Sequence, residues 1–281
     1  MFACVGCREA GKTVVFTGEA MGTSYRIKCA GGKGFDTGAI DVLCDQLDEE
    51  LSTWRDDSWV SRFNAAPAAT RFVMPEHVEE LLKLSKAITE ETHGRFDPTA
   101  GALVKLWGFG AWKNEWTGEP SDGEVSAALE ASGFGNLQID GHQIMKSSSQ
   151  LMLDFSGIAK GYAVDQMAGL LREDGYRDFV IEFGGEVFAS GAAPGKDHWT
   201  ISGPAQGSRL QLRNEAAASS GSEHQHRGMW SHVIDPRNGR PIRVGPPVTV
   251  RARTCARADA LATATLVKAA EPSKRPRTEE R

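Results

Sequence analysis

Long apolar runs are absent from this chain of 281 residues, although 40% of its residues are hydrophobic. No run is long or apolar enough to span a membrane as a helix. Positive charge is not in excess either, because 32 Lys and Arg stand against 37 Asp and Glu, giving a formal net charge of −5. Nucleic-acid-binding proteins normally carry a basic face, so this balance argues against a nucleic-acid partner. The length still suffices for one large or two small cores.

The cysteines do not form a recognisable framework. There are five, Cys4, Cys7, Cys29, Cys44 and Cys255, and an odd number leaves one unpaired in any monomeric disulfide scheme. Cys4-Val5-Gly6-Cys7 has CxxC spacing, but no second Cys or His pair follows at the spacing of a zinc site. The sequence therefore disfavours a structural metal or redox site in this segment.

A complete secretory signal is also missing, because the first residues contain neither a basic region nor a full apolar region. Met1 to Cys7 nevertheless resembles the tail of a bacterial lipoprotein signal, with a small residue before a cysteine. Two interpretations of residues 1–12 stay open: the remnant of a signal or linker in a chain begun late or trimmed, and a short disordered N-terminus.

The apolar pattern alternates irregularly between helical and strand periods, which predicts an α+β or mixed α/β fold rather than a doubly wound parallel sheet. No internal repeat is present. The expected elements, in order, are strands over 13–17 and 24–29, a helix over 36–51, a loop from Trp54 to Asn64, a helix with Pro75 at its first position that ends at His93-Gly94, a Trp-rich loop over 107–123, a helix over 122–132, short strands over 136–146, strands over 178–182 and 185–190, a β-rich region over 197–252 and a final helix from near Arg257.

Residues 153–165 read as an apolar strand-like entry, a small-residue turn and then a helix. Free backbone N–H groups and the positive dipole end of a helix start favour bound anions, and Lys160 in the first turn adds a full charge. Asp154 leads into the turn, where its carboxylate can accept from a sugar hydroxyl or a heterocycle N–H. Taken alone, this segment is better explained as an ordinary strand–turn–helix with a solvated lysine.

Three other positions carry possible chemistry, and each has a structural alternative. Asp97 lies in a Phe-Asp-Pro-Thr turn, where it is either a turn-former or a ligand contact. Gly184-Gly185 between two short apolar strands permits close approach of a ligand to the backbone, or forms a plain bulge. His232 on a predicted strand is a possible general base near neutral pH, but a lone strand histidine is commonly structural.

Asp259 and Thr263 are the best metal candidates. They are four residues apart on a predicted helix and so share one face. A carboxylate, a hydroxyl and a backbone carbonyl make an all-oxygen set that suits Mg²⁺, which keeps several waters and bridges phosphates. The structural alternative is an Asp in the first turn of the helix beside a buried Thr.

Taken together, these segments resemble a known family. Met21-Gly22-Thr23, the segment from Trp54 to Asn64, Phe96-Asp97-Pro98-Thr99, Trp107-Gly108-Phe109-Gly110, Asp154 to Asp165, Gly184-Gly185, Ser219-Ser220-Gly221, His232 to Gly239 and Ala258 to Ala264 occur in the order seen in the FAD:protein FMN transferases, the ApbE-type flavin transferases of bacteria. The joint order of these motifs is specific, and the resemblance covers roughly residues 13–266, within an expected transferase domain over 13–267.

The resemblance implies a T-fold-like α+β protein that binds FAD, splits its pyrophosphate with Mg²⁺ and passes FMN to a Ser or Thr hydroxyl of an acceptor protein of respiratory or electron-transfer type, releasing AMP. It also implies a bacterial periplasmic location or an inner-membrane lipid anchor. The positions matched to FAD contacts are Met21, Trp54, Arg95, Phe96, Asp97, Asp154 and Lys160. Those matched to the metal site are Gly157 (through its carbonyl), Asp259 and Thr263, and His232 is matched as activator of the acceptor hydroxyl.

Three departures from the family pattern bear on activity. Trp54 stands where Tyr is common, and still offers a stacking face. The Glu223-His224-Gln225-His226 loop is short and His-rich, and the resemblance stops near Val267, so that 268–281 reads as a disordered tail. This ending keeps two alternatives open: a non-catalytic FAD-binding protein, and an FAD pyrophosphatase that lacks an acceptor. The sequence names neither the acceptor nor the oligomeric state.

Overall fold

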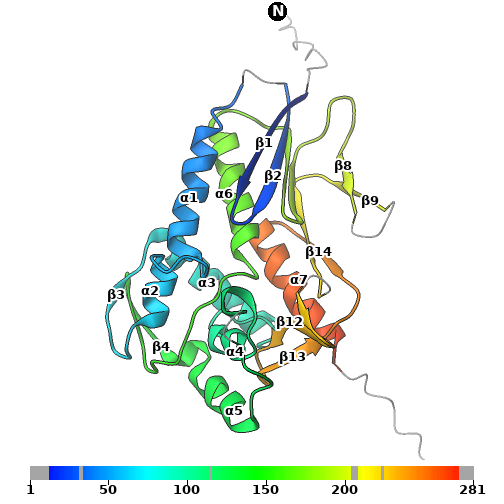
Figure 1. Cartoon of the computed structure of the whole chain (residues 1–281). Coiled ribbons are helices and arrows are strands. Elements are labelled where there is room, and N and C mark those ends of the chain that lie inside the picture. The colour runs from blue at the N-terminus through cyan, green and yellow to red at the C-terminus, as the bar shows by residue number, and fades with distance from the viewer. Residues whose placement is uncertain (1–12, 32–33, 114–115, 204–207, 223–224, 272–281) are drawn as a thin grey trace, which may run out of the picture.

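The computed structural model describes residues 13–31, 34–113, 116–203, 208–222 and 225–271. A six-stranded, fully antiparallel sheet forms one half of the molecule, in the order β1-β2-β6-β7-β10-β14 (Figure 1). Its strands are β1 (Thr13–Ala20), β2 (Thr23–Ala30), β6 (Phe179–Phe183), β7 (Glu186–Ser190), β10 (Glu215–Ser220) and β14 (Val248–Ala252).

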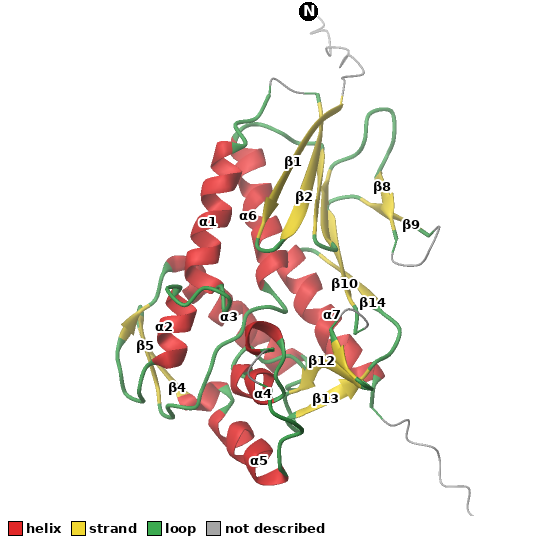
Figure 2. Ribbon diagram, viewed as in Figure 1, coloured by secondary structure: helices red, strands yellow, loops and turns green. Residues whose placement is uncertain are grey.

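Three helices cover one face of this sheet: α1 (Gly38–Leu51), α6 (Ala159–Glu173) and α7 (Cys255–Ala269) (Figure 2). The main core lies between the helices and the sheet and includes Ile27, Leu47, Val164, Ile181 and Ala260, all fully buried. Alternate residues of the central strands, such as Val180 and Ala189, point to the other face. There they form a second core with the hairpin of β8 (Trp199–Ser202) and β9 (Arg209–Leu212). This two-sided burial explains why the central strands are mostly apolar on both faces.

The other half of the molecule is built mainly from helices and two small sheets. It contains α2 (Trp59–Ala65), α3 (Glu76–Glu91), α4 (Gly101–Leu106), the 3₁₀ turn η1 (Gly110–Trp112), α5 (Asp122–Ala131) and a second 3₁₀ turn, η2 (Phe134–Asn136). One sheet has the order β3 (Phe72–Val73), β5 (Gln143–Lys146), β4 (Leu137–Asp140). The other has the order β11 (His226–Arg227), β12 (Trp230–Asp235), β13 (Arg240–Arg243).

Most of the expected elements are present, and the α+β prediction is confirmed. The loop predicted from Trp54 to Asn64 is wrong in part, because its second half forms α2. The Ser58 hydroxyl accepts from the Ser61 N–H and caps this helix, while Trp59 and Phe63, one helical turn apart, are buried and stacked. Pro75 is the N-cap of α3 rather than its first helical residue, and the strand-like entry before the Asp154 turn pairs only through a single bridge between Ala100 and Met152.

The folded part of the chain runs past the expected boundary at Val267. Helix α7 continues to Ala269, and Glu271 accepts from Arg95 Nε at 2.8 Å and from Arg237 at 2.7 Å. Residues 268–271 therefore belong to the folded domain, whereas the predictions for 1–12 and 272–281 lie outside the described residues.

Two further features of the described residues concern membrane-spanning helices and cysteines. No helix there has the length and apolar character needed to cross a membrane. Cys29, Cys44 and Cys255 are free and buried. Cys4 and Cys7 lie outside the described residues.

Candidate functional site

The turn that begins α6 is tied to the Phe96–Thr99 segment by a backbone hydrogen bond. The Asp154 N–H donates to the Pro98 carbonyl at 2.7 Å, and the Asp154 carboxylate accepts from the Ser156 N–H at 2.9 Å. Lys160 is the second residue of α6. The predicted turn and helix start are thus present, with a lysine in the first turn.

Helix α7 is locked against α6 by a close approach of the two backbones. A Cβ on Gly161 would lie 2.4 Å from the Cys255 carbonyl oxygen, so only glycine fits there. The Asp165 carboxylate accepts from the N–H groups of Cys255 and Ala256 at 2.7 and 2.8 Å, which satisfies free donors at the start of α7. Asp165 and Gly161 therefore fix where the first turns of α7 lie.

This packing places Asp259 beside the start of α6. Asp259 is 6% exposed, and its Oδ2 accepts from the Gly161 N–H at 3.1 Å. Burial raises the pKa of Asp259, and the nearby Lys160 opposes that rise. One hydrogen bond from Gly161 and the charge of Lys160 offset the desolvation of this carboxylate only in part. A bound cation would stabilise such a buried carboxylate further.

Lys160 is paired with a carboxylate that the sequence motifs did not single out. Its Nζ lies 2.6 Å from Glu186 Oε2, and Glu186 at the start of β7 is 2% exposed. Burial and the charge of Asp259 raise the pKa of Glu186, while Lys160 lowers it. Burial alone would lower the pKa of Lys160, but Glu186 and Asp259 outweigh it and keep the ammonium charged.

Thr263 faces the turn before α6. A Cβ built on Gly157 would lie 3.3 Å from Thr263 Oγ1 and 3.4 Å from the Phe96 ring. The three predicted metal positions, Gly157, Asp259 and Thr263, are thus gathered by the packing of α6 against α7.

The donor chemistry of these positions fits Mg²⁺ rather than zinc. The described residues contain no group of three or more His, Cys, Asp or Glu side chains able to hold a metal. The set is one carboxylate, one hydroxyl and one carbonyl, all oxygen, and Mg²⁺ completes such a sparse set with waters and substrate phosphates. Within the described residues, Thr263 makes no side-chain hydrogen bond that would compete with a ligand role.

The predicted FAD-contact residues 95–97 lie beside the turn before α6, where the Phe96 ring approaches Gly157. The Asp97 carboxylate accepts from the Thr99 N–H and hydroxyl at 2.9 and 2.6 Å, the geometry of a turn-former. Burial raises the pKa of Asp97, and the bonds from Thr99 oppose that. The Phe96 ring is buried, whereas Arg95 is half-buried and binds Glu271, so its guanidinium is held by an ion pair.

Met21 approaches the site through the β1–β2 turn, where it has a φ of 47°. Next to it, Thr23 lies 2.8 Å from the position of a Cβ on Gly184, and the Lys160 side chain lies 3.4 Å from that position. Gly184 and Gly185 have φ values of 60° and 108°, so the β6–β7 turn requires glycine and brings backbone close to Lys160.

Trp54 lies in the loop between α1 and α2, and His232 lies on β12, so the two come from different parts of the chain than Lys160 and Asp259. Trp54 is 59% exposed, with Lys113 Nζ 5.5 Å from its ring centroid, so its stacking face is accessible. His232 lies on β12 with Nδ1 3.1 Å from the Gln225 carbonyl. Because a carbonyl only accepts, this contact places hydrogen on Nδ1 and makes Nε2 the basic nitrogen of the neutral ring.

Sequence reasoning missed Glu186, Asp165 and Lys113. Glu186 had a signal, since a carboxylate in an otherwise apolar strand after two glycines calls for a buried partner. Asp165 accepts hydrogen bonds at the start of α7, and Lys113 lies over the Trp54 ring. Both contacts arise from tertiary packing, so local sequence gave no signal for them.

Comparisons with known proteins agree with this geometry. The sequence model of the ApbE family matches residues 21–278. An FAD:protein FMN transferase of Vibrio cholerae is 34% identical, over 93% of this chain and 83% of that protein. A protein with the same name from Klebsiella pneumoniae is 31% identical, over 92% and 79%.

Solved structures show the same likeness. The apo form of the Pseudomonas stutzeri flavinyl transferase ApbE superposes with a TM-score of 0.83 at 35% identity, covering 91% of this chain and 84% of that one. The flavin transferase ApbE from Vibrio cholerae gives a TM-score of 0.81 at 33% identity, covering 91% and 87%. The α+β architecture is that of the flavin transferases, and the chain belongs to the ApbE family. The family match reaches residue 278, beyond the point where the motifs alone suggested that it stops.

Proposed function

We propose that this protein transfers the FMN moiety of FAD to a Ser or Thr hydroxyl of an acceptor protein, using Mg²⁺ and releasing AMP. Family membership makes it a transferase, and the named relatives are FAD:protein FMN transferases. The observation that carries the proposal is the gathering of Gly157, Lys160, Asp259 and Thr263 where α6 and α7 pack together.

In this proposal the α6–α7 site holds the pyrophosphate of FAD. Asp259, Thr263 and the Gly157 carbonyl hold Mg²⁺, which when bound neutralises phosphate charge and stabilises the charge that develops in phosphoryl transfer. Lys160 supplies a positive charge kept in place by Glu186 at 2.6 Å. Its position in the first turn of α6 adds the helix dipole to that charge.

FAD is further positioned by residues around this site. Met21 and Trp54 offer an apolar contact and a stacking face to the ring systems, and Asp154 accepts hydrogen bonds from hydroxyl or ring N–H groups. The segment from Arg95 to Asp97 contributes backbone groups and the Phe96 ring, because its two charged side chains already have partners.

The chemical step needs a base on the acceptor side. His232 removes the proton of the acceptor hydroxyl through Nε2, the hydroxyl oxygen forms a bond to the FMN phosphorus, and the bond from that phosphorus to the AMP oxygen breaks. AMP leaves, and the acceptor carries FMN as a phosphoester. We also propose, from the same family resemblance, a periplasmic or membrane-anchored location.

The test is transfer with and without metal. The protein is incubated with FAD and an acceptor protein carrying a Thr site, and the acceptor mass and free AMP are followed. Equal amounts of acceptor-bound FMN and AMP are expected with Mg²⁺, and neither with excess EDTA, while FAD binding persists through stacking. AMP without modified acceptor supports the pyrophosphatase alternative, and FAD binding without either product supports the non-catalytic one. Transfer undiminished in EDTA contradicts the proposed metal site.

A further inference from the structure

The ring of Trp54, the proposed stacking face for FAD, is covered on one side by Lys113. The Lys113 Nζ lies 5.5 Å from the centroid of the Trp54 ring, a distance at which a cation is attracted to the face of an indole. A second ring does not fit between the two, because each stacked contact takes about 3.5–4 Å. Lys113 therefore occupies one face of the indole, and the opposite face is left for a ligand.

The backbone of Trp54 is held in place, whereas its ring is largely free. The Trp54 N–H donates to Ser52 Oγ at 3.2 Å, and Ser58 Oγ donates to the Ser52 carbonyl at 2.6 Å, which ties this loop to the start of α2. The ring is 59% exposed, and within the described residues no other aromatic ring pairs with it. A ligand that stacks on such a ring must immobilise it, and this ordering lowers the affinity.

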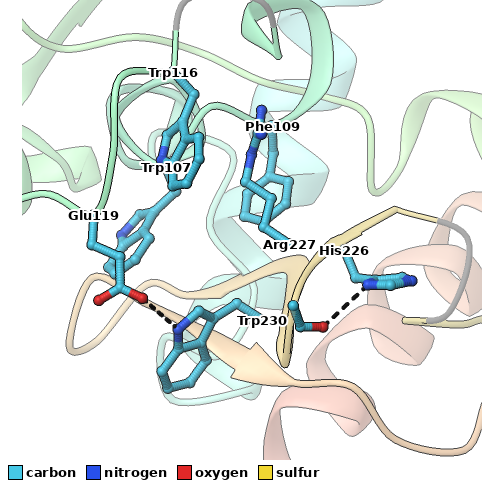
Figure 3. A pocket seen from close by; sticks show the side chains of 8 residues that line it. Trp107, Phe109, Trp116, Glu119, His226, Arg227 and Trp230 are labelled. Atoms are coloured by element: carbon cyan, nitrogen blue, oxygen red, sulfur yellow. Dashed lines mark hydrogen bonds between the residues drawn. The ribbon is translucent and has the colours of Figure 1, made fainter.

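Lys113 is presented to Trp54 from a firmly held backbone. Arg227, on β11, donates from Nη2 to the carbonyls of Gly108 and Lys113, both at 2.6 Å. Its guanidinium lies 4.4 Å from the Trp116 ring centroid and 5.8 Å from that of Phe109 (Figure 3). These hydrogen bonds and ring contacts fix the segment that ends at Lys113 against the β11–β12 hairpin, so the ammonium starts from a defined position.

We propose that Lys113 is a positioning residue for FAD, whose ammonium holds one face of Trp54 so that the other face is presented to a ring system of FAD. This inference rests on the proposed function, since it requires FAD to stack on Trp54. In the part of the chain that the structure describes, the Lys113 ammonium forms no ion pair that would compete with this contact. Holding the ring before FAD arrives lowers the entropy cost of stacking, so Lys113 acts on FAD affinity through Trp54.

The test is a double-mutant cycle on FAD affinity. FAD is titrated by calorimetry, in the presence of EDTA, into the wild type, Lys113→Ala, Trp54→Ala and the double variant. Lys113→Ala is expected to raise the Kd for FAD about two- to fivefold, the effect of losing one exposed cation–π contact. Trp54→Ala is expected to raise the Kd as well, and adding Lys113→Ala to it should have no further effect.

Two further variants separate this role from net charge and from stability. Lys113→Arg should keep the wild-type Kd, because a guanidinium also covers an indole face. Lys86→Ala is the matched control, since Lys86 is exposed on α3, forms no ion pair within the described residues and carries the same charge. It should leave the Kd unchanged. Thermal melting checks that each variant is folded.

Equal losses of affinity from Lys113→Ala in the wild-type and Trp54→Ala backgrounds would show that Lys113 acts on FAD directly, and would overturn the inference. An unchanged Kd in Lys113→Ala, when Trp54→Ala weakens binding, would also overturn it while leaving the proposed function intact. An unchanged Kd in Trp54→Ala would remove Trp54 from the FAD site, and the inference would fail with it. A wild-type protein that binds no FAD would contradict the proposed function and the inference together.

Discussion

At the scale of single residues, the site depends on a buried charge arrangement that the motifs revealed only in part. Lys160 and Asp259 follow from sequence, because a helix start and a four-residue spacing are local properties. Glu186 does not, because its partner lies 26 residues away and its burial comes from the sheet. Lys160, for which the sequence left open an anion-binding role or that of a solvated lysine, is the counter-charge of the buried Glu186 carboxylate.

Lys160→Ala is therefore expected to damage both binding and stability. Loss of the ammonium removes a charge from the FAD site and leaves Glu186 buried without its partner, which costs about 3–5 kcal/mol unless the carboxyl is protonated. The double variant Lys160→Ala with Glu186→Gln should recover most of the melting temperature but not the FAD affinity. Calorimetric FAD titration and thermal melting of both proteins check this. Equal melting temperatures for the single variant and the wild type would contradict it.

Lys146 gives a residue-scale prediction about pH. Lys146 is 1% exposed, its ammonium donates to the carbonyls of Asn64 and Leu151 at 2.7 and 3.0 Å, and burial lowers its pKa from 10.5 to about 8. Between these pH values the unfolded chain binds the extra proton, so the free energy of unfolding rises with pH across this window. Urea unfolding at pH 7.5, 8.5 and 9.5 should show wild type gaining stability relative to Lys146→Met. A difference that is constant with pH would show that Lys146 does not titrate there.

At the scale of elements, the sequence predicted well where the signal was local and poorly where it was not. The starts of α6 and α7 were expected within a few residues, since small-residue turns and apolar periods mark them. The sequence predicted a loop where α2 lies, although Ser58 is a typical N-cap and Trp59 and Phe63 are an apolar pair one turn apart. Seven residues are too few for a helical period to be recognised. The contact of α6 with α7 could not be predicted from local sequence, because a glycine within a helix does not indicate which segment packs against it.

Gly161 gives the element-scale prediction. Gly161→Ala forces the start of α7 away from α6, since the new Cβ would lie 2.4 Å from the Cys255 carbonyl. We expect a loss of about 1–3 kcal/mol in unfolding free energy and a large fall in metal-dependent transfer. Gly169→Ala on the same helix is the control, because no atom lies within 4 Å of its Cβ position, and it should stabilise by up to about 1 kcal/mol. Equal effects of the two substitutions would refute the role of this helix contact.

At the scale of the whole molecule, the C-terminal segment joins the two halves of the site. Composition suggested a tail from Lys268, but Glu271 bridges Arg95, the first residue of the predicted FAD-contact segment 95–97, and Arg237, in the turn after β12. Sequence could not show this, because the partners are 176 and 34 residues away. Deleting 268–281 is expected to lower stability, because it removes Glu271 and both of its ion pairs.

Glu271→Gln isolates the ion pairs from the rest of that deletion. Loss of these two partly exposed pairs should lower the free energy of unfolding slightly, and by less at high salt, because surface pairs are screened. Glu173→Gln is the control, since Glu173 forms no ion pair within the described residues. Urea unfolding of both variants at low and high salt is the measurement, and an identical response of the two would show that the bridge contributes nothing.

The central claim is that the buried Asp259 carboxylate, where α6 meets α7, holds the metal for transfer of FMN. Its most direct test is the mass of an acceptor protein after incubation with FAD across a series of Mg²⁺ concentrations, for wild type and Asp259→Asn. The substitution keeps the size and the bond from Gly161 but removes the charge. The account predicts one FMN added per acceptor by the wild type and a loss of at least about a hundredfold in rate for the folded variant at low Mg²⁺. Near-normal transfer by Asp259→Asn at low Mg²⁺ would contradict it.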